Sequence, residues 1–268
     1  DPPLLSVLVA PIARLRGAKL VNWLQDVFPE VAGALKVRGV RGPMLRLLKA
    51  ARNVSVRTAD ANIVLGERMR ALMRGQGVAA DKLHIIHNWA DSDSIQPIAP
   101  TDNPYRESWG LQGKFVVGYS GNLGRAHEYR TILQAAQLLA QQGRDDVIFL
   151  FIGGGVQRAV LEKEARERGI KNLRFLPYQK REHLSQSLSA ADVHLVSLNP
   201  ALEGLIVPSK FYGVAAAGRP SIFIGDPDGE IPRILRNAEC GFTVGSGGGL
   251  GLAALIAGLG DEPVRCGN

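Results

Sequence analysis

Residues 115–125 read Phe-Val-Val-Gly-Tyr-Ser-Gly-Asn-Leu-Gly-Arg, an apolar run that passes directly into a glycine-rich turn. The run Phe115–Ser120 is typical of a buried strand, and glycines at the carboxyl end of a strand let backbone N–H groups approach an anion. A helix after such a turn points the positive end of its dipole at the same place. The pattern predicts a phosphate-binding turn at Gly121, Asn122 and Gly124. A tight turn without a ligand is the alternative.

Basic side chains and a second glycine-rich turn accompany the first. Arg125 and His127 add side-chain donors beside it, and Gly153-Gly154-Gly155 follows the next predicted strand, before a helix that carries Arg158. The carboxyl ends of neighbouring parallel strands meet at one edge of a sheet, so the two turns are expected to converge on one crevice. Taken alone, the turn that ends at Gly155 is equally consistent with a plain connection.

A third segment, Glu203–Lys210, leads into a helix of small residues that ends near Gly218. Pro208 and Ser209 form a typical helix start with Ser209 as N-cap, so free N–H groups and Lys210 could face an anion there. The small residues suit close packing beside a ligand, and packing in the core is the alternative.

The order of elements predicts an α/β fold. From residue 115 onward, apolar runs alternate with amphipathic helices, which is typical of a parallel sheet covered on both faces. Strands are expected at Phe115–Ser120, Val147–Ile152, Leu173–Leu176, Val193–Leu198, Ser221–Ile224 and Gly241–Val244. Helices are expected at about 128–142, 156–168, 181–190, 209–217, 229–237 and 248–258. Six strands alternating with helices form a complete Rossmann-like domain.

The first part of the chain carries a shorter series of the same kind. Strands are expected at Lys19–Asp26, Ala61–Gly66 and Leu83–Asn88, and helices at about Pro43–Arg57 and Glu67–Gly75. The apolar segment 2–13 is shorter than the roughly 20 residues that span a bilayer and is expected to form a buried helix. The polar stretch 90–114 contains three prolines and is predicted to be a linker, which places the domains at 1–100 and 101–268.

Two carboxylates follow the first predicted strand. Asp26 and Glu30 lie in the sequence Gln-Asp-Val-Phe-Pro-Glu at 25–30, at the carboxyl end of a strand, where functional side chains often occur. The equally supported alternative is that they stabilise the start of the helix after Pro29.

Composition limits the class of protein. The two cysteines, Cys240 and Cys266, are too few for a disulfide framework, no metal-ligand spacing joins them to the five histidines, and no signal peptide is visible. A cytoplasmic protein is therefore expected. The chain starts with Asp1 and stops after 262–268 without a closing element, so we expect a fragment. Walker, Gly-x-Ser-x-Gly and His-Glu-x-x-His motifs are absent from the sequence, which argues against ATPase and hydrolase functions.

The positive charge is unevenly placed. Residues 1–100 hold 14 Lys and Arg against 8 Asp and Glu, a balance of +6 out of the formal +7 of the chain. Such a surface suits nucleic acid or an anionic membrane. The predicted helix at 43–57 places Arg46, Lys49, Asn53 and Arg57 on one flank, which is compatible with peripheral contact at the inner membrane face or with a merely solvated surface.

Six segments, taken in order, carry a family resemblance over essentially the whole chain. They are Gln-Asp-Val-Phe-Pro-Glu at 25–30, Ala-Asp-Ala-Asn-Ile-Val-Leu-Gly-Glu at 59–67, His-Asn-Trp-Ala-Asp at 87–91, Gly-Tyr-Ser-Gly-Asn-Leu-Gly at 118–124, Ala-Asp-Val-His-Leu-Val at 191–196 and Pro-Ser-Lys-Phe-Tyr-Gly-Val-Ala-Ala-Ala-Gly-Arg-Pro at 208–220. Together they resemble the family-4 type of retaining glycosyltransferases, and within it the branch that builds colanic acid and other bacterial exopolysaccharides. The resemblance implies the glycosyltransferase-B fold of two Rossmann-like domains, with the first one incomplete at its amino-terminal side.

The resemblance also implies roles for single residues. Gly121, Asn122 and Gly124 match the loop that approaches the distal phosphate of the donor, and Arg125 and His127 lie near places where relatives keep basic residues against the diphosphate. By the same resemblance, Pro177 and Tyr178 follow the strand that faces the nucleobase. The segment with Pro208, Ser209 and Lys210 matches the one that grips phosphate and ribose.

The sequence departs from the family pattern at three places. Relatives often carry two glutamates in the last of these segments, and the corresponding places here are Leu205 and Gly213, with Glu203 close by. A ribose contact from the second glutamate is therefore absent or replaced. Relatives also often have a histidine before the aspartate of the first-domain loop, where this chain has Gln25.

The implied reaction transfers a hexosyl or deoxyhexosyl group from a nucleoside diphosphate sugar to a saccharide acceptor, expected to be lipid-linked, with retention of configuration. The loop amides, Arg125 and Lys210 would stabilise the leaving diphosphate, so neither a cofactor nor a metal is expected. Asp26 and Glu30 would face the acceptor or the transferred sugar. The resemblance implies no nucleic-acid partner. Alternatives are a non-catalytic nucleotide-sugar-binding member of a polysaccharide-assembly complex and a nucleotide-sugar epimerase.

Overall fold

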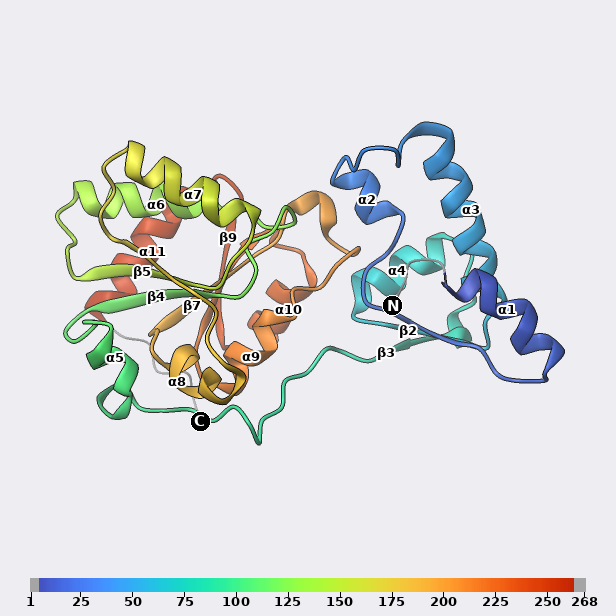
Figure 1. Cartoon of the computed structure of the whole chain (residues 1–268), viewed down its shortest axis with the longest axis horizontal. Helices are drawn as coiled ribbons and strands as arrows, with labels where there is room; N and C mark the ends of the chain where they lie inside the picture. The colour runs from blue at the N-terminus through green and yellow to red at the C-terminus, as the bar shows by residue number, and fades with distance from the viewer. Residues whose placement is uncertain (1–4, 263–268) are drawn as a thin grey trace. The chain divides into compact units, whose positions relative to one another are not determined.

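The computed structural model describes residues 5–262. Within them the chain forms two compact units (Figure 1): the first comprises the chain up to Asn88 together with Ala201–Val207, and the second comprises Trp89–Pro200 and the chain from Pro208 onward. The division thus falls at Asn88 and not at the predicted residue 100, and a short segment from the second half of the sequence belongs to the first unit.

The second unit is a parallel sheet of six strands in the order β6-β5-β4-β7-β8-β9. The strands are β4 (Phe115–Ser120), β5 (Val147–Ile152), β6 (Leu173–Leu176), β7 (Val193–Ser197), β8 (Ser221–Gly225) and β9 (Gly241–Gly245). All six predicted strands are confirmed within one residue at each end. The order reverses beside β4, and at such a switch point the loops after adjacent strands diverge and leave a crevice.

Helices cover both faces of this sheet, as the alternating pattern predicted. On one face (Figure 1), α6 (Arg130–Gln141), α7 (Val156–Glu167) and α11 (Gly249–Asp261) bury side chains such as Ile132, Leu161 and Ile256 against the strands. On the other face lie α5 (Pro104–Ser108), α8 (Leu184–Ser189) and α9 (Lys210–Ala216), which contribute to two smaller clusters. The last helix of this unit, α10 (Glu230–Asn237), lies against β8 and β9.

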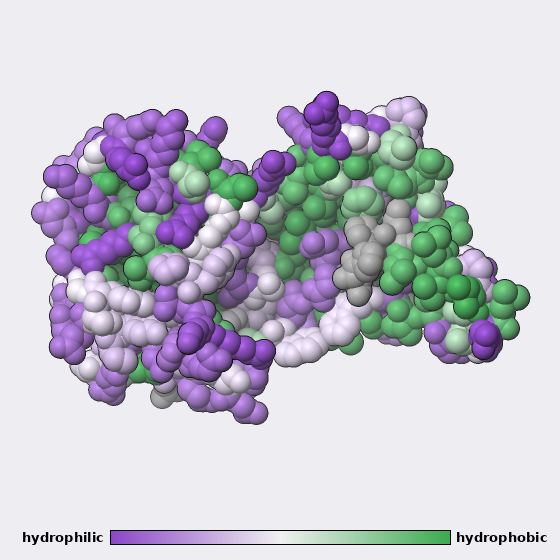
Figure 2. Space-filling view, in the orientation of Figure 1, coloured by the Kyte–Doolittle hydropathy of each residue, from purple (hydrophilic) through white to green (hydrophobic). Residues whose placement is uncertain are grey.

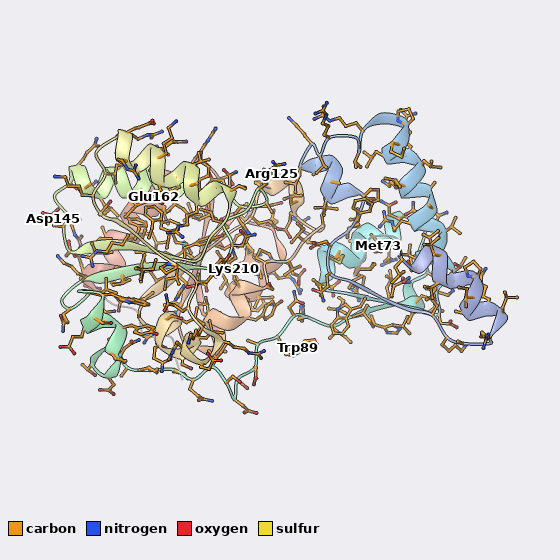
Figure 3. The ribbon with its side chains drawn as sticks, viewed as in Figure 1. Met73, Trp89, Arg125, Asp145, Glu162 and Lys210 are labelled. Atoms are coloured by element: carbon orange, nitrogen blue, oxygen red, sulfur yellow. The ribbon has the colours of Figure 1, made fainter. Side chains whose placement is uncertain are left out.

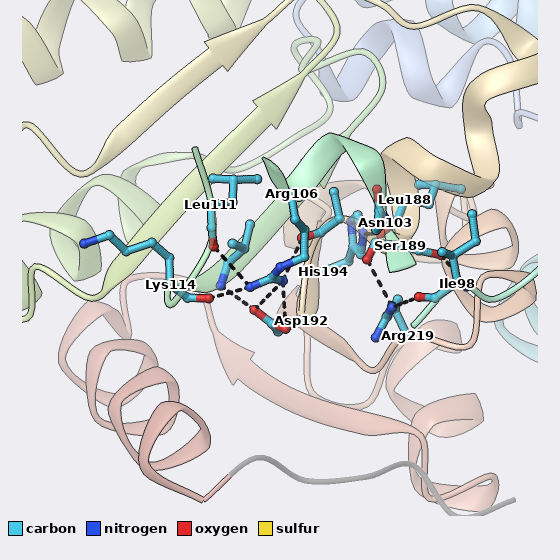
Figure 4. A network of polar contacts seen from close by, with 12 residues as sticks. Ile98, Asn103, Arg106, Leu111, Lys114, Leu188, Ser189, Asp192, His194 and Arg219 are labelled. Atoms are coloured by element: carbon cyan, nitrogen blue, oxygen red, sulfur yellow. Dashed lines mark hydrogen bonds and ion pairs between the residues drawn. The ribbon is translucent and has the colours of Figure 1, made fainter. Parts of the chain in front are cut away.

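The stretch 90–114 is more than a linker. It contains the short 3₁₀ turn η2 (Pro100–Asp102) and α5, and Arg106 of α5 is buried. The Arg106 guanidinium donates to both carboxylate oxygens of Asp192, at 3.0 and 3.1 Å, and to the carbonyl oxygens of Ala190, Leu111 and Lys114 (Figure 4). The linker prediction was wrong here because proline content marks breaks in periodicity but not whether the segment packs on its neighbour.

The first unit contains the parallel three-stranded sheet β1-β2-β3, formed by β1 (Val21–Leu24), β2 (Ala61–Val64) and β3 (Leu83–Ile85). Its helices are α1 (Leu5–Leu15), α2 (Glu30–Ala34), α3 (Gly42–Thr58) and α4 (Glu67–Gly75), and the 3₁₀ turn η1 (Ala80–Lys82) precedes β3. The three predicted strands are confirmed in shorter form, and the bounds of α4 agree with the prediction at both ends.

Helix α1 corrects the prediction of a buried helix at the start of the chain. The helix forms, but none of its residues is buried, and Leu8, Ile12 and Leu15 are 72%, 61% and 86% exposed. Figure 2 shows the resulting hydrophobic surface over α1. Apolar composition predicted burial, whereas α1 packs on α3 through only part of its circumference.

Two further sequence predictions can be placed. Cys240 is half-buried and forms no disulfide, whereas Cys266 lies outside the described residues. No helix within 5–262 is both long and apolar enough to cross a membrane.

Candidate functional site

The two predicted glycine-rich turns interlock at the carboxyl edge of the second unit's sheet. Gly121, Gly153 and Gly155 have φ values of +114°, +132° and +118°, which side-chain-bearing residues rarely adopt. A Cβ on Gly153 would collide with the carbonyl oxygen of Gly121, and one on Gly155 would lie 2.5 Å from that of Leu123. The turns meet backbone to backbone, with hydrogen bonds of 2.8 Å from Gly121 N to Ile152 O and from Leu123 N to Gly154 O.

This packing leaves backbone donors unused. Among the described residues, the N–H groups of Asn122, Gly124 and Arg125 have no hydrogen-bond acceptor, and neither do those of Ser209 and Lys210 at the start of α9. Ser209 occupies the N-cap position, as predicted, but its side chain makes no capping hydrogen bond. Several free N–H donors grouped at the carboxyl edge of a parallel sheet commonly form an anion-binding site.

Lys210 brings its ammonium group to the first turn (Figure 3). The Nζ atom donates to the Tyr119 hydroxyl and to Asn122 O at 3.2 Å, and it lies 3.3 Å from His127 Nε2. It also lies 4.2 Å from the centroid of the Tyr119 ring. No carboxylate among the described residues forms an ion pair with it, so an anion entering the turn would meet an uncompensated cation.

Burial changes the ionisation of this cluster. Desolvation lowers the pKa of Lys210 to about 7, because the charged form loses its hydration. Desolvation and the nearby Lys210 lower the pKa of His127 to about 4, although Ser197 O, 2.7 Å from Nδ1, opposes the shift. His127 is therefore neutral at pH 7. A bound diphosphate would favour the charged form of Lys210.

A row of aromatic rings, which the sequence reading did not single out, runs beneath the turns. Tyr119, Phe151 and Phe175 stack with centroid separations of 5.6 and 5.3 Å. At its far end the Arg158 guanidinium lies 5.6 Å from the Phe175 centroid and donates to Gly153 O. The signal was present in the sequence, because each ring is the penultimate residue of its predicted strand and adjacent parallel strands set such positions side by side.

The predicted nucleobase segment lies beside the second turn. The ring of Tyr178 is 61% exposed, and a Cβ on Gly154 would lie 3.1 Å from it. The carbonyl oxygen of Pro177 accepts a 3.0 Å hydrogen bond from Gln179 Nε2. An exposed aromatic ring that lies against a glycine-rich turn can stack on a planar base.

Two predicted donor residues make no contact that defines a role. Arg125 is exposed and forms no hydrogen bond or ion pair with any described residue, although Figure 3 places it with Lys210 at the end of the sheet opposite Asp145. Pro208 is buried and precedes the start of α9. The structure thus joins Asn122, His127 and Lys210 directly, along with the glycines of both turns.

Asp26 and Glu30 belong to the first unit. Glu30 lies in the first turn of α2, as the helix-start alternative expected, but no side chain caps this helix, and Glu30 forms an ion pair with the buried Arg52 of α3. Asp26 follows β1, where it forms an isolated bridge with Ile206 and lines a pocket of about 440 Å³ together with Trp23, Gln25 and Arg52. Desolvation raises the pKa of the Asp26 carboxyl. Their catalytic role stays a prediction.

The described residues contain no cluster of three or more His, Cys, Asp or Glu side chains that could hold a metal ion. Free amides, a half-buried cation and an exposed aromatic ring at the switch point of a parallel sheet are features that suit a phosphorylated ligand with a planar ring.

Comparison with known proteins identifies the family to which the chain belongs. The model of the glycosyl transferases group 1 family matches residues 102–257, and the chain belongs to that family. It is 32% identical over 258 residues to the probable glycosyltransferase WbjE of Pseudomonas aeruginosa, covering 95% of this chain and 63% of that protein. It is also 28% identical to the putative colanic acid biosynthesis glycosyl transferase WcaI of Escherichia coli K12, covering 83% of this chain and 55% of the relative.

Solved structures confirm the glycosyltransferase-B fold. Anabaena Alr3699/HepE in complex with UDP superposes with a TM-score of 0.77 at 18% identity, over 97% of this chain and 68% of that one. The lipopolysaccharide glycosyltransferase WaaG gives 0.71 at 15% identity, over 95% and 72%. The chain spans somewhat under two thirds of the length of the curated relatives.

Proposed function

We propose that the second unit binds a nucleoside diphosphate sugar and that the chain takes part in transferring the sugar to a saccharide during bacterial exopolysaccharide synthesis. The observation that carries the proposal is the Lys210 ammonium, held without a carboxylate partner beside the free amides of the Gly121–Gly124 turn. UDP is the nucleotide we favour, because HepE was solved in complex with UDP and with UDP-glucose.

Retention of configuration and independence of metal are parts of the same proposal. The charge that develops on the leaving diphosphate would be stabilised by the loop amides, Lys210 and Arg125, a role that preorganised donors fill well in a site shielded from water. Asp26 and Glu30 of the first unit would face the acceptor or the transferred sugar. The basic first part of the chain would favour a lipid-linked acceptor at the inner membrane face, through contact with anionic headgroups.

Calorimetric titration of the full chain with UDP, GDP, ADP and dTDP tests the donor site. We expect selective binding of one nucleotide, lost in a variant with Arg125→Ala and Lys210→Ala, and unchanged in the control Arg166→Ala, whose side chain is 79% exposed on α7. A folded chain that binds none of the four would refute the donor site. Transfer in the presence of EDTA, with the anomeric configuration of the product read by NMR, tests metal independence and retention.

A non-catalytic nucleotide-sugar-binding role is the second candidate. Two positions where relatives often carry glutamates favour it, because this chain has the apolar Leu205 at one of them and Gly213, which has no side chain, at the other. Nucleotide binding without transfer to any saccharide acceptor would support this candidate. Isomerised nucleotide sugar in the absence of an acceptor would instead indicate an epimerase.

A further inference from the structure

Tyr119 is the residue through which the first turn and helix α9 are joined. Its side chain is 1% exposed, and its hydroxyl donates to Asn122 O at 3.3 Å while accepting a hydrogen bond from Lys210 Nζ. Because Lys210 Nζ also donates to Asn122 O, the phenol, the ammonium group and the turn carbonyl form a closed triangle. Tyr119 and Asn122 belong to the end of β4 and the turn that follows it, whereas Lys210 comes from α9, 91 residues from Tyr119.

The ring of Tyr119 contributes separately from its hydroxyl. Lys210 Nζ lies 4.2 Å from the ring centroid, within the range in which a cation is attracted to an aromatic face, and desolvation strengthens that attraction. Stacking on Phe151, which stacks on Phe175, keeps the ring from turning away. A lysine side chain otherwise has many rotamers, and ordering it on binding would weaken affinity.

We propose that Tyr119 is a positioning residue for the donor diphosphate, acting through Lys210, whose ammonium group it holds at the Gly121–Gly124 turn before the ligand arrives. The inference rests on the proposed donor site and adds to it a residue that need not touch the ligand. Lys210 is the group that contacts phosphate, and Tyr119 fixes where its charge lies.

A double-mutant cycle on UDP binding tests this mechanism. Calorimetry compares the unaltered chain with Tyr119→Phe, Lys210→Met and the double variant. Phenylalanine keeps the ring and its stacking, so the fold should persist, and loss of a hydrogen bond to a charged group should weaken UDP binding by about tenfold. In the Lys210→Met background the same Tyr119→Phe change should have a much smaller effect, because the route through the ammonium group is gone and only the weak 3.3 Å hydrogen bond to Asn122 O is lost.

Tyr129→Phe is the matched control. Tyr129 is also a buried tyrosine of the second unit, and its hydroxyl donates to Glu164 at 2.7 Å, on a different helix pair from Lys210. We expect unchanged UDP affinity in this variant. Tyr119→Leu, which removes the ring as well, should weaken binding further than Tyr119→Phe, with the fold checked by circular dichroism.

The pH dependence gives a readout that a purely structural role would not change. The titratable groups in contact with Lys210 are Tyr119 and His127, and the low pKa of His127, about 4, keeps it neutral above pH 6. UDP affinity should therefore decline as pH rises past about 7, where free Lys210 loses its proton. In Tyr119→Phe the decline should begin at lower pH, because the ammonium form has lost an acceptor, and in Lys210→Met it should be absent.

The outcomes separate this inference from the donor site itself. Equal losses from Tyr119→Phe in both backgrounds, or no loss in either, would overturn the positioning role while leaving nucleotide binding in place. Failure of the folded, unaltered chain to bind any nucleotide would overturn both.

Discussion

Lys210 is a half-buried cation that contacts hydroxyl, carbonyl and imidazole groups but no carboxylate of the described residues. Such a group costs stability unless an anion is bound, although the surrounding dipoles solvate it in part. Because of Lys210, the stability of the second unit should depend on pH and on whether an anionic ligand is bound.

The pH dependence of stability follows from the lowered pKa of Lys210. In the folded chain this pKa is about 7, and in the unfolded chain it returns to about 10.4, so the unfolded state binds more protons between these values. Stability of the ligand-free chain should rise with pH across this window. Urea titrations at pH 7 and pH 9.5 should show the rise in the unaltered chain and a smaller one in Lys210→Met. Equal slopes in the two proteins would show that Lys210 is not desolvated.

Gly153 offers a second test at the scale of one residue. Replacement by Ala places a Cβ against Gly121 O at φ +132°, so the two turns must separate. Gly143→Ala is the control, since Gly143 also has a positive φ, of +72°, but no atom within 4 Å of the added Cβ. We expect Gly153→Ala to lower the free energy of unfolding by about 2 kcal/mol more than Gly143→Ala, measured by urea denaturation, and to abolish UDP binding. Similar losses from the two substitutions would exclude the close approach of the turns.

At the scale of elements, α5 is fixed to the sheet by one guanidinium. Arg106 bridges Asp192, just before β7, and the carbonyl oxygens around 111–114, just before β4. The half-buried Asp192 carboxylate and several carbonyl oxygens depend on that side chain, since main-chain groups out of reach of water need a partner. The network in Figure 4 thus connects the segment 98–114 to the rest of the second unit.

Removal of this guanidinium should be costly. Arg106→Leu would leave Asp192 without its ion-pair partner and should lower the free energy of unfolding by about 3–5 kcal/mol. In the exposed pair of Lys163 and Glu167 on α7, Lys163→Gln should change stability by less than about 0.5 kcal/mol. Thermal and chemical denaturation of both variants measure the difference, and a mild effect of Arg106→Leu would mean that water replaces the guanidinium.

At the scale of the whole molecule, the two units should respond differently to nucleotide. The proposed donor site lies within the second unit, so binding of UDP should stabilise that unit directly, by about 2.7 kcal/mol at a hundredfold excess over the dissociation constant. Hydrogen exchange with and without UDP should show new protection at 118–127 and 208–214. Protection confined to the first unit would place the nucleotide site elsewhere.

The sequence alone determined the elements and their class. The six strands of the second unit, the helices between them and the glycine-rich turns were predictable because hydrophobic periodicity and glycine placement are local properties of the chain. The family was predictable from the order of six short segments, and Lys210 and His127 from their place beside predicted turns.

Only the tertiary structure decided which groups meet. The contact of Lys210 with Tyr119 joins positions 91 residues apart, and no local pattern specifies such a pair. The same holds for Arg106 with Asp192, for the return of Ala201–Val207 to the first unit, and for the exposure of α1. Burial and pairing depend on how elements stack, and that depends on the combined packing of the whole sheet and its helices, which a one-dimensional pattern does not contain.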